Sequence, residues 1–163
     1  MLTEALSLSN RAVVSIVGAG GKTSLMYALA HELASAGNKV LTTTTTKIFM
    51  PAHEECPAVI VSKNIDEVIE KAHSLIRHSL HLTVAAEYLS EQGKLKGVRP
   101  NFLKQILESD LFDYIIVEAD GAAQRPLKVC GPHEPVVPAF TDRIVSLVGL
   151  DVVGKPLDER WVF

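Results

Sequence analysis

The sequence predicts an α/β fold in three layers, with a mostly parallel sheet flanked by helices. Short apolar, β-branched runs alternate with segments whose apolar residues recur at helical spacing, and the connections between them are short. The 163 residues are enough for one domain, residues 1–163, and few for two. Hydrophobic residues make up 47% and charged residues 21%, as in ordinary folded domains.

The first half of the chain predicts a strand, a helix and a second strand. Residues 12–17 form a short apolar run typical of a strand buried on both faces. Residues 22–36 place Leu25, Leu29 and Leu33 on one helical face, and Gly37 can end this helix. A strand at 39–43 follows after a very short turn. This order favours parallel strands with a helix packed on them.

The second half continues the same alternation. Asn64 and Glu67 resemble a capping box at the start of a helix. The other predicted elements are strands at 58–61, 82–86, 113–118 and 144–150, a hairpin or edge excursion at 87–98, a helix at 100–107 and a proline-rich loop at 121–138.

A glycine-rich turn joins the first strand to the first helix and predicts a phosphate loop. Glycines allow a tight turn, successive amides can form an anion nest, and the helix N-terminus adds free donors. Lys22 can reach phosphates, and the Thr23 hydroxyl can ligate Mg²⁺. The residues expected to contact nucleotide are Gly18, Ala19, Gly20, Gly21, Lys22, Thr23 and Ser24. We therefore expect a P-loop NTPase-like domain.

The loop departs from the usual G-x-x-x-x-G-K-[ST] spacing because Ile16 stands where the first glycine would be. It has instead the shorter G-x-x-G-K-T form, which some ATP-dependent ligases of cell-wall synthesis use. A dinucleotide-binding G-x-G-x-x-G loop would need glycine in place of Thr23, so that class is disfavoured. A ligand-free turn is the remaining alternative.

An acidic strand end predicts the second half of a nucleotide site. The apolar run 114–117 leads to Glu118, and Gly121 follows at the spacing of a D-x-x-G element with Glu in place of Asp. A carboxylate here would hold the Mg²⁺ shell or orient water. Glu118 and Asp120 are both candidates, and Lys22 completes the predicted catalytic set. The alternative is a polar strand terminus on a loop.

Two further segments are candidates for contacts to phosphate or to a second substrate. The threonine run 42–46 favours a strand, but it extends to the sheet edge where ligands bind, and both interpretations stay open. The proline-rich loop follows the acidic motif, and its cations would offset the charge of a bound phosphate. The alternative is a solvated loop without a ligand. The residues proposed for these contacts are Thr44, Thr45, Lys47, Arg125, Lys128, His133 and Glu134.

Composition excludes several other classes. A net charge of −3 and a pI near 6.1, without a basic run, argue against nucleic-acid binding. No apolar stretch approaches the ~18 residues of a membrane span, and no secretory signal begins the chain, so a cytoplasmic location is expected. His53, Cys56, Cys130 and His133 have the residue types of a zinc site. Their wide separation makes chance placement the favoured explanation.

With these motifs in order, the chain resembles the YqeC family of selenium-dependent hydroxylase accessory proteins. The resemblance rests on residues 17–24, 42–47, 117–122, 125–128, 133–135, 141–143, 149–151 and 154–157. It implies a role in maturing molybdenum hydroxylases, with a molybdenum hydroxylase or its cofactor as partner. Relatives are expected to continue past Phe163, so this chain would lack a C-terminal extension.

Three hypotheses follow for function. The first is an accessory protein that binds ATP or GTP with Mg²⁺ and hydrolyses it, Thr23 and Glu118 holding the metal. The second is a small-molecule kinase or ATP-dependent ligase, and the third is a nucleotide-binding module without turnover. The sequence contains no N-K-x-D segment, so it does not distinguish ATP from GTP, and it leaves the oligomeric state open.

Overall fold

A computed structural model describes residues 1–8 and 10–163. Its main sheet contains six strands, all parallel, in the order β4-β5-β2-β8-β1-β9. These strands are β1 (Ala12–Gly18), β2 (Val40–Thr44), β4 (Val59–Val61), β5 (His81–Ala85), β8 (Tyr114–Glu118) and β9 (Arg143–Leu147). The predicted α/β fold with a parallel sheet is confirmed.

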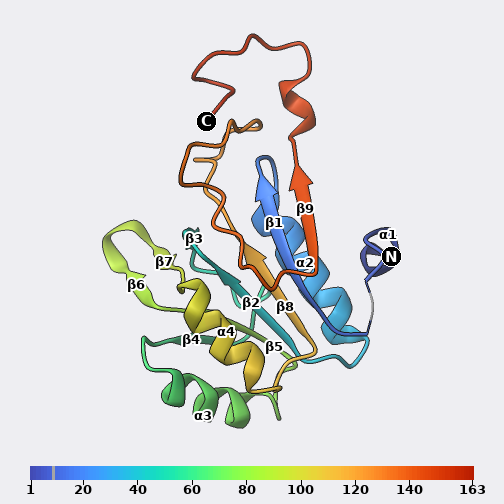
Figure 1. Ribbon diagram of the computed structural model, residues 1–163, viewed down its shortest axis with the longest axis vertical. Coiled ribbons are helices and arrows are strands. Elements are labelled where there is room, and N and C mark those ends of the chain that lie inside the picture. The colour runs from blue at the N-terminus through green and yellow to red at the C-terminus, as the bar shows by residue number, and fades with distance from the viewer. Residues whose placement is uncertain (9) are drawn as a thin grey trace.

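Helices cover both faces of this sheet (Figure 1). They are α1 (Leu2–Ala5), α2 (Lys22–Ser35), α3 (Ile65–Leu75) and α4 (Pro100–Glu108). The alternation of side chains along β1 sends Val14 and Ile16 into the core beneath α2, whereas Val13 and Val17 belong to the core beneath α3 and α4. The sheet is therefore the middle layer of three.

A second, three-stranded antiparallel sheet was not predicted as such. It has the order β3-β7-β6 and consists of β3 (Lys47–Phe49), β6 (Glu87–Leu89) and β7 (Lys94–Lys96), with a 3-10 turn at Ser90–Gln92. The hairpin expected within residues 87–98 is β6 and β7. Strand β3, directly after the threonine run, was missed because three residues carry too little periodicity.

Two local predictions need correction. The side chain of Asn64 does cap α3, accepting from the amides of Asp66 and Glu67, but Glu67 does not bond back to Asn64. Its carboxylate accepts from Ser62 Oγ instead, so the capping box is only half formed. The last strand, expected over 144–150, ends at Leu147, and a 3-10 turn at Leu150–Val152 follows.

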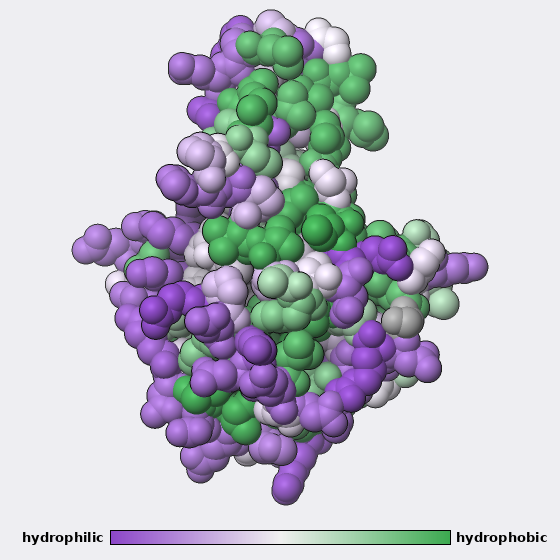
Figure 2. Space-filling view, in the orientation of Figure 1, coloured by the Kyte–Doolittle hydropathy of each residue, from purple (hydrophilic) through white to green (hydrophobic). Residues whose placement is uncertain are grey.

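The chain beyond β9 extends away from the layered body and then folds back (Figure 1). Its final residues pair with the proline-rich loop, since Leu127 N donates to Trp161 O and Phe163 N donates to Leu127 O. Apolar side chains are exposed here, Leu150 at 87%, and Figure 2 shows them gathered at this end of the molecule. None of the described helices combines the length and hydropathy of a bilayer span.

Candidate phosphate-binding site

The turn from β1 to α2 forms a glycine cradle. Gly18, Gly20 and Gly21 have φ values of 91°, 75° and 96°, which side chains rarely tolerate. A Cβ on Gly20 would also lie 2.4 Å from the backbone of Gly149. Within the described chain, the amides of Gly20 and Gly21 donate to no protein acceptor, and α2 has no side-chain cap. Unbonded amides at a helix start are a site for an anion.

Lys22 is held beside this cradle by a buried carboxylate. Its ammonium donates to Gly18 O at 2.6 Å and lies 3.1 Å from Asp120 Oδ1. Asp120 is fully buried, its Oδ2 accepts from Gly18 N at 2.9 Å, and its Oδ1 accepts no hydrogen bond of regular geometry. Asp120 therefore holds both the loop backbone and the Lys22 side chain in place from the buried side of the loop. Lys22 still lines the cavity on the other side.

Glu118 lies at the cavity wall and accepts from Thr23 Oγ1 at 2.7 Å. Its backbone carbonyl accepts from Thr44 Oγ1 at 2.8 Å and from Thr45 N at 3.1 Å, which fixes the end of β8 against β2. Burial raises the pKa of the Glu118 carboxyl; Thr23 and Lys22 partly oppose this, and the charge of Asp120 adds to it. Thr23 and Glu118 together present the oxygen donors that Mg²⁺ prefers.

The threonine run has two roles. Thr42, Thr43 and Thr44 are completely buried, and their hydroxyls bond within the sheet, so Thr44 is not exposed for a ligand. Thr45 and Thr46 line the cavity, although Thr45 Oγ1 donates to Val136 O at 3.0 Å. The first part of the run therefore supports the sheet and the second faces the site.

The predicted site residues of the proline-rich loop differ in whether they reach the cavity. Arg125 lines the cavity and lies over the Phe163 ring at 5.5 Å. Lys128 has a side chain only 1% exposed, bonds to Gly121 O and Glu134, and lies 3.8 Å from Asp120 Oδ2. Lys128 and Glu134 are thus committed to an internal charge network. His133 is exposed and is not among the cavity-lining residues.

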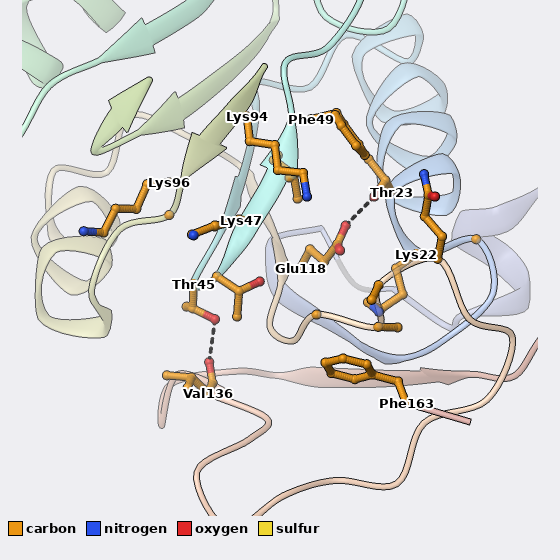
Figure 3. A pocket seen from close by; sticks show the side chains of 18 of the residues that line it. Lys22, Thr23, Thr45, Lys47, Phe49, Lys94, Lys96, Glu118, Val136 and Phe163 are labelled. Carbon is orange, nitrogen blue, oxygen red and sulfur yellow. Dashed lines mark hydrogen bonds between the residues drawn. The ribbon is translucent and has the colours of Figure 1, made fainter. Parts of the chain in front are cut away.

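All these elements surround one cavity of about 750 Å³ at the carboxyl ends of the parallel strands (Figure 3). The loop from Gly20 to Ser24 forms one wall. Sequence reasoning missed the wall opposite, to which the small antiparallel sheet and the start of α4 contribute Phe49, Lys94, Lys96 and Arg99. Phe163 was also missed; it is brought in by the pairing of the final residues with the proline-rich loop.

The four residues considered for zinc do not form a recognisable site. The described chain contains no group of three or more His, Cys, Asp or Glu side chains placed to hold a metal ion. Cys56 is buried, and its thiol donates to Ala58 O at 3.2 Å, whereas Cys130 is exposed. Burial raises the pKa of the Cys56 thiol, as expected of a structural cysteine.

Comparison with known proteins identifies the family. A profile described as YqeC protein matches residues 14–163, from β1 to the last residue. The chain belongs to the YqeC family. The resemblance inferred from the motifs is thereby confirmed, and the matched region contains the glycine loop, Glu118 and both walls of the cavity.

Among proteins similar to this YqeC-family member, the Escherichia coli (strain K12) protein named "Uncharacterized protein YqeC" is 34% identical over 159 residues. The alignment covers 91% of this chain and 57% of the relative, so the chain spans little more than half of that protein's length. No solved structure matches the chain significantly.

Proposed function

We propose that this YqeC-family member binds a nucleoside triphosphate, ATP or GTP, together with Mg²⁺, and hydrolyses it as an accessory protein. The proposal rests on one observation above all: two unbonded glycine amides, Lys22 and the Thr23–Glu118 pair open onto the same cavity. Amides and an ammonium suit phosphate oxygens, and a hydroxyl beside a carboxylate suits Mg²⁺.

Each residue has a distinct task in this proposal. The amides of Gly20 and Gly21 and the Lys22 ammonium hold the phosphates, while Thr23 and Glu118 supply oxygen ligands for the metal shell. Bound Mg²⁺ would neutralise phosphate charge. Asp120, buried and bonded to Gly18 N, positions Lys22 instead of meeting the metal, so Glu118 is the metal-linked acid. We extend the proposal to maturation of a selenium-dependent molybdenum hydroxylase, which the family resemblance implies.

Thr23 offers a matched pair of variants that tests this assignment. Thr23→Ser keeps a hydroxyl for the metal, whereas Thr23→Val keeps the shape and removes it. We expect Mg²⁺ to strengthen ATP or GTP binding to the wild type and to Thr23→Ser. In Thr23→Val most of that gain should disappear, a loss of roughly tenfold or more. Isothermal titration calorimetry with and without Mg²⁺ measures it.

The outcomes separate the candidate functions. The proposed nucleotide site would be refuted if the wild type bound neither ATP nor GTP. It would also be refuted if Mg²⁺ raised nucleotide affinity equally in Thr23→Ser and Thr23→Val. Phosphate release with nucleotide alone supports hydrolysis, and binding without release supports a module that holds nucleotide. Lys22→Ala is a weaker test, because it leaves Asp120 buried and without its closest counter-charge.

A second candidate function, transfer to or ligation of a small molecule, is favoured by the cavity itself. Its far wall carries additional cations on the other side of Glu118 from the phosphate loop. Turnover that appears only when a small acceptor is added would favour this function over hydrolysis.

A further inference from the structure

The three-stranded sheet β3-β7-β6 turns one face to the cavity. Lys47 and Phe49 of β3 lie opposite Lys96 and Lys94 of β7, respectively, so these four side chains share a face. The intervening residues, Ile48 and Leu95, point the other way into the hydrophobic core. The sheet therefore has an apolar face that anchors it and a cationic face that lines the cavity.

The charges on this wall are poorly neutralised. Lys47 and Lys96 are directly opposite each other, and like charges in that position destabilise a sheet. Lys96 also lies opposite Glu87, whose carboxylate is bound by Lys63 at 2.8 Å. Within the described chain, no ion pair joins Lys47 or Lys94 to a carboxylate; the Lys94 ammonium lies over the Phe49 ring, 4.7 Å from its centroid.

The cavity as a whole is strongly cationic. Its walls include six basic residues and one acid, Glu118. Arg99 adds to the excess: it precedes α4, forms no ion pair within the described residues, and starts a helix with no acid in its first turn. Figure 3 shows Lys94 extending toward Glu118 and Lys96 pointing away from it. Lys47 and Arg99 line the same cavity as Lys94.

These cations are separate from the phosphate loop. In the strand order β2-β8-β1, the loop follows β1, Glu118 ends β8, and Lys47 comes three residues after the end of β2. Two strand spacings correspond to roughly 10 Å. Glu118 thus lies between the loop and Lys47 in the order of the strands.

We propose that Lys47, Lys94 and Arg99 bind the phosphate group of a second small molecule, on the opposite side of Glu118 from the nucleotide. A phosphate monoester carries close to two negative charges at neutral pH, which suits three cations without a carboxylate partner among the described residues better than a single carboxylate does. The proposal rests on the proposed function only in naming nucleotide as the first ligand. The cations of this wall line the cavity whether or not nucleotide binds.

Inorganic phosphate is the probe, and amide chemical shifts in ¹⁵N-resolved NMR spectra are the readout. Phosphate is titrated at constant ionic strength into protein whose loop is saturated with a non-hydrolysable Mg²⁺-nucleotide analogue, and separately into Lys22→Ala without nucleotide. We expect saturable shifts at residues 45–47 and 94–99 in both cases. The second arm reports on this wall even if nucleotide does not bind.

The affinity is then compared between two doubly substituted variants of equal charge. Lys47→Gln/Lys94→Gln removes two of the proposed contacts, and Lys71→Gln/Lys104→Gln removes two exposed helix lysines outside the cavity lining. We expect phosphate affinity at the wall to fall about tenfold or more in the first variant and to be unchanged in the second. Circular dichroism and thermal unfolding verify that both double variants and Lys22→Ala fold.

Three results would overturn the proposal: no shifts at the wall in either arm, equal phosphate affinity in the two double variants, or a loss of nucleotide affinity in Lys47→Gln/Lys94→Gln as large as its loss of phosphate affinity. The last result would mean that the nucleotide itself occupies this wall. Failure of nucleotide to saturate the wild type would count against the proposed function alone.

Discussion

Glu118 and Asp120 are only two residues apart, yet their environments give them different roles. Residues two apart in a strand would share a face, but β8 ends at Glu118, and the turn that follows places the Asp120 carboxylate beneath the glycine loop while the Glu118 carboxylate lies at the cavity wall. Asp120 has Gly18 N and two lysines as partners, whereas Glu118 has a hydroxyl and the space of the cavity. A metal ion would therefore be more readily accommodated at Glu118 than at Asp120.

Glu118→Gln tests how much stability the protein loses when the buried Glu118 carboxyl ionises. Burial raises the pKa of Glu118 above its ordinary value of 4.5, so the folded state holds the proton more tightly than the unfolded chain. Ionisation therefore costs stability as the pH rises from 4.5 through the raised pKa. The glutamine cannot ionise and still accepts from Thr23. We expect its free energy of unfolding, relative to wild type, to rise over this pH range and then level off.

Urea denaturation at several pH values without Mg²⁺ measures that difference. The control is Glu108→Gln, an exposed glutamate on α4 paired with Lys104 at 3.7 Å. Its difference from wild type should change little with pH. A Glu118→Gln difference that stays constant, or that falls as the pH rises, would contradict a raised pKa.

At the scale of elements, the segment from β7 to α4 is fastened closely to the end of β2. Gly97 N donates to Thr46 O at 2.8 Å, and Val98 N donates to Thr44 O at 2.9 Å. A Cβ on Gly97 would lie 2.1 Å from the Thr44 carbonyl oxygen, far inside contact distance. The same contact holds Arg99 at the cavity, so the geometry of the cationic wall depends on a glycine here.

Gly97→Ala is expected to destabilise the protein by about 1–3 kcal/mol, because backbone must move to admit the methyl group. Gly131→Ala is the matched control: Gly131 is exposed, has no positive φ, and a Cβ there would meet nothing within 4 Å. It should change the free energy of unfolding by less than about 0.5 kcal/mol. Chemical denaturation compares the two variants. Equal changes in the free energy of unfolding would argue against the close approach of Gly97 to the Thr44 carbonyl oxygen.

At the scale of the whole molecule, the parallel sheet brings distant segments to one edge. The register places Ile16 and Thr44 on either side of Glu118, so the loops that follow β1 and β2 meet at the end of β8. Helices α2 and α4 cover opposite faces of the sheet and both begin at the cavity. A ligand there would contact every layer and stabilise the fold as a unit.

Ligand-linked unfolding checks this expectation. At a free Mg²⁺-nucleotide concentration of 100 times Kd, the wild type should gain roughly 2.7 kcal/mol, by mass action. For a chain of this size the midpoint of thermal unfolding should rise by roughly 5–10 °C. Thr23→Val at the same ligand concentration should gain much less than Thr23→Ser. No shift in the wild type at any concentration would argue against binding to the folded state.

Local signals explain which features were predictable. The apolar run of β1, the glycines and the Lys-Thr pair lie within a dozen residues, and their meaning depends on backbone conformation alone. The strand–helix alternation likewise predicted the parallel sheet. Lys94, Arg99 and Phe163 carry no such signal, since a lysine in a short strand looks the same facing solvent or a ligand. The family could be inferred because motif order is itself a property of sequence.

By itself, then, the sequence determined the α/β class, the position of the glycine loop and the family, because each follows from local periodicity, φ preference or residue order. Folding in three dimensions settles that Glu118 lies at the cavity while Asp120 is buried beneath the loop, that Thr44 and Lys128 have internal partners, and that a second, cationic wall faces the loop. Those outcomes depend on strand register, burial and long-range packing, which no short segment encodes.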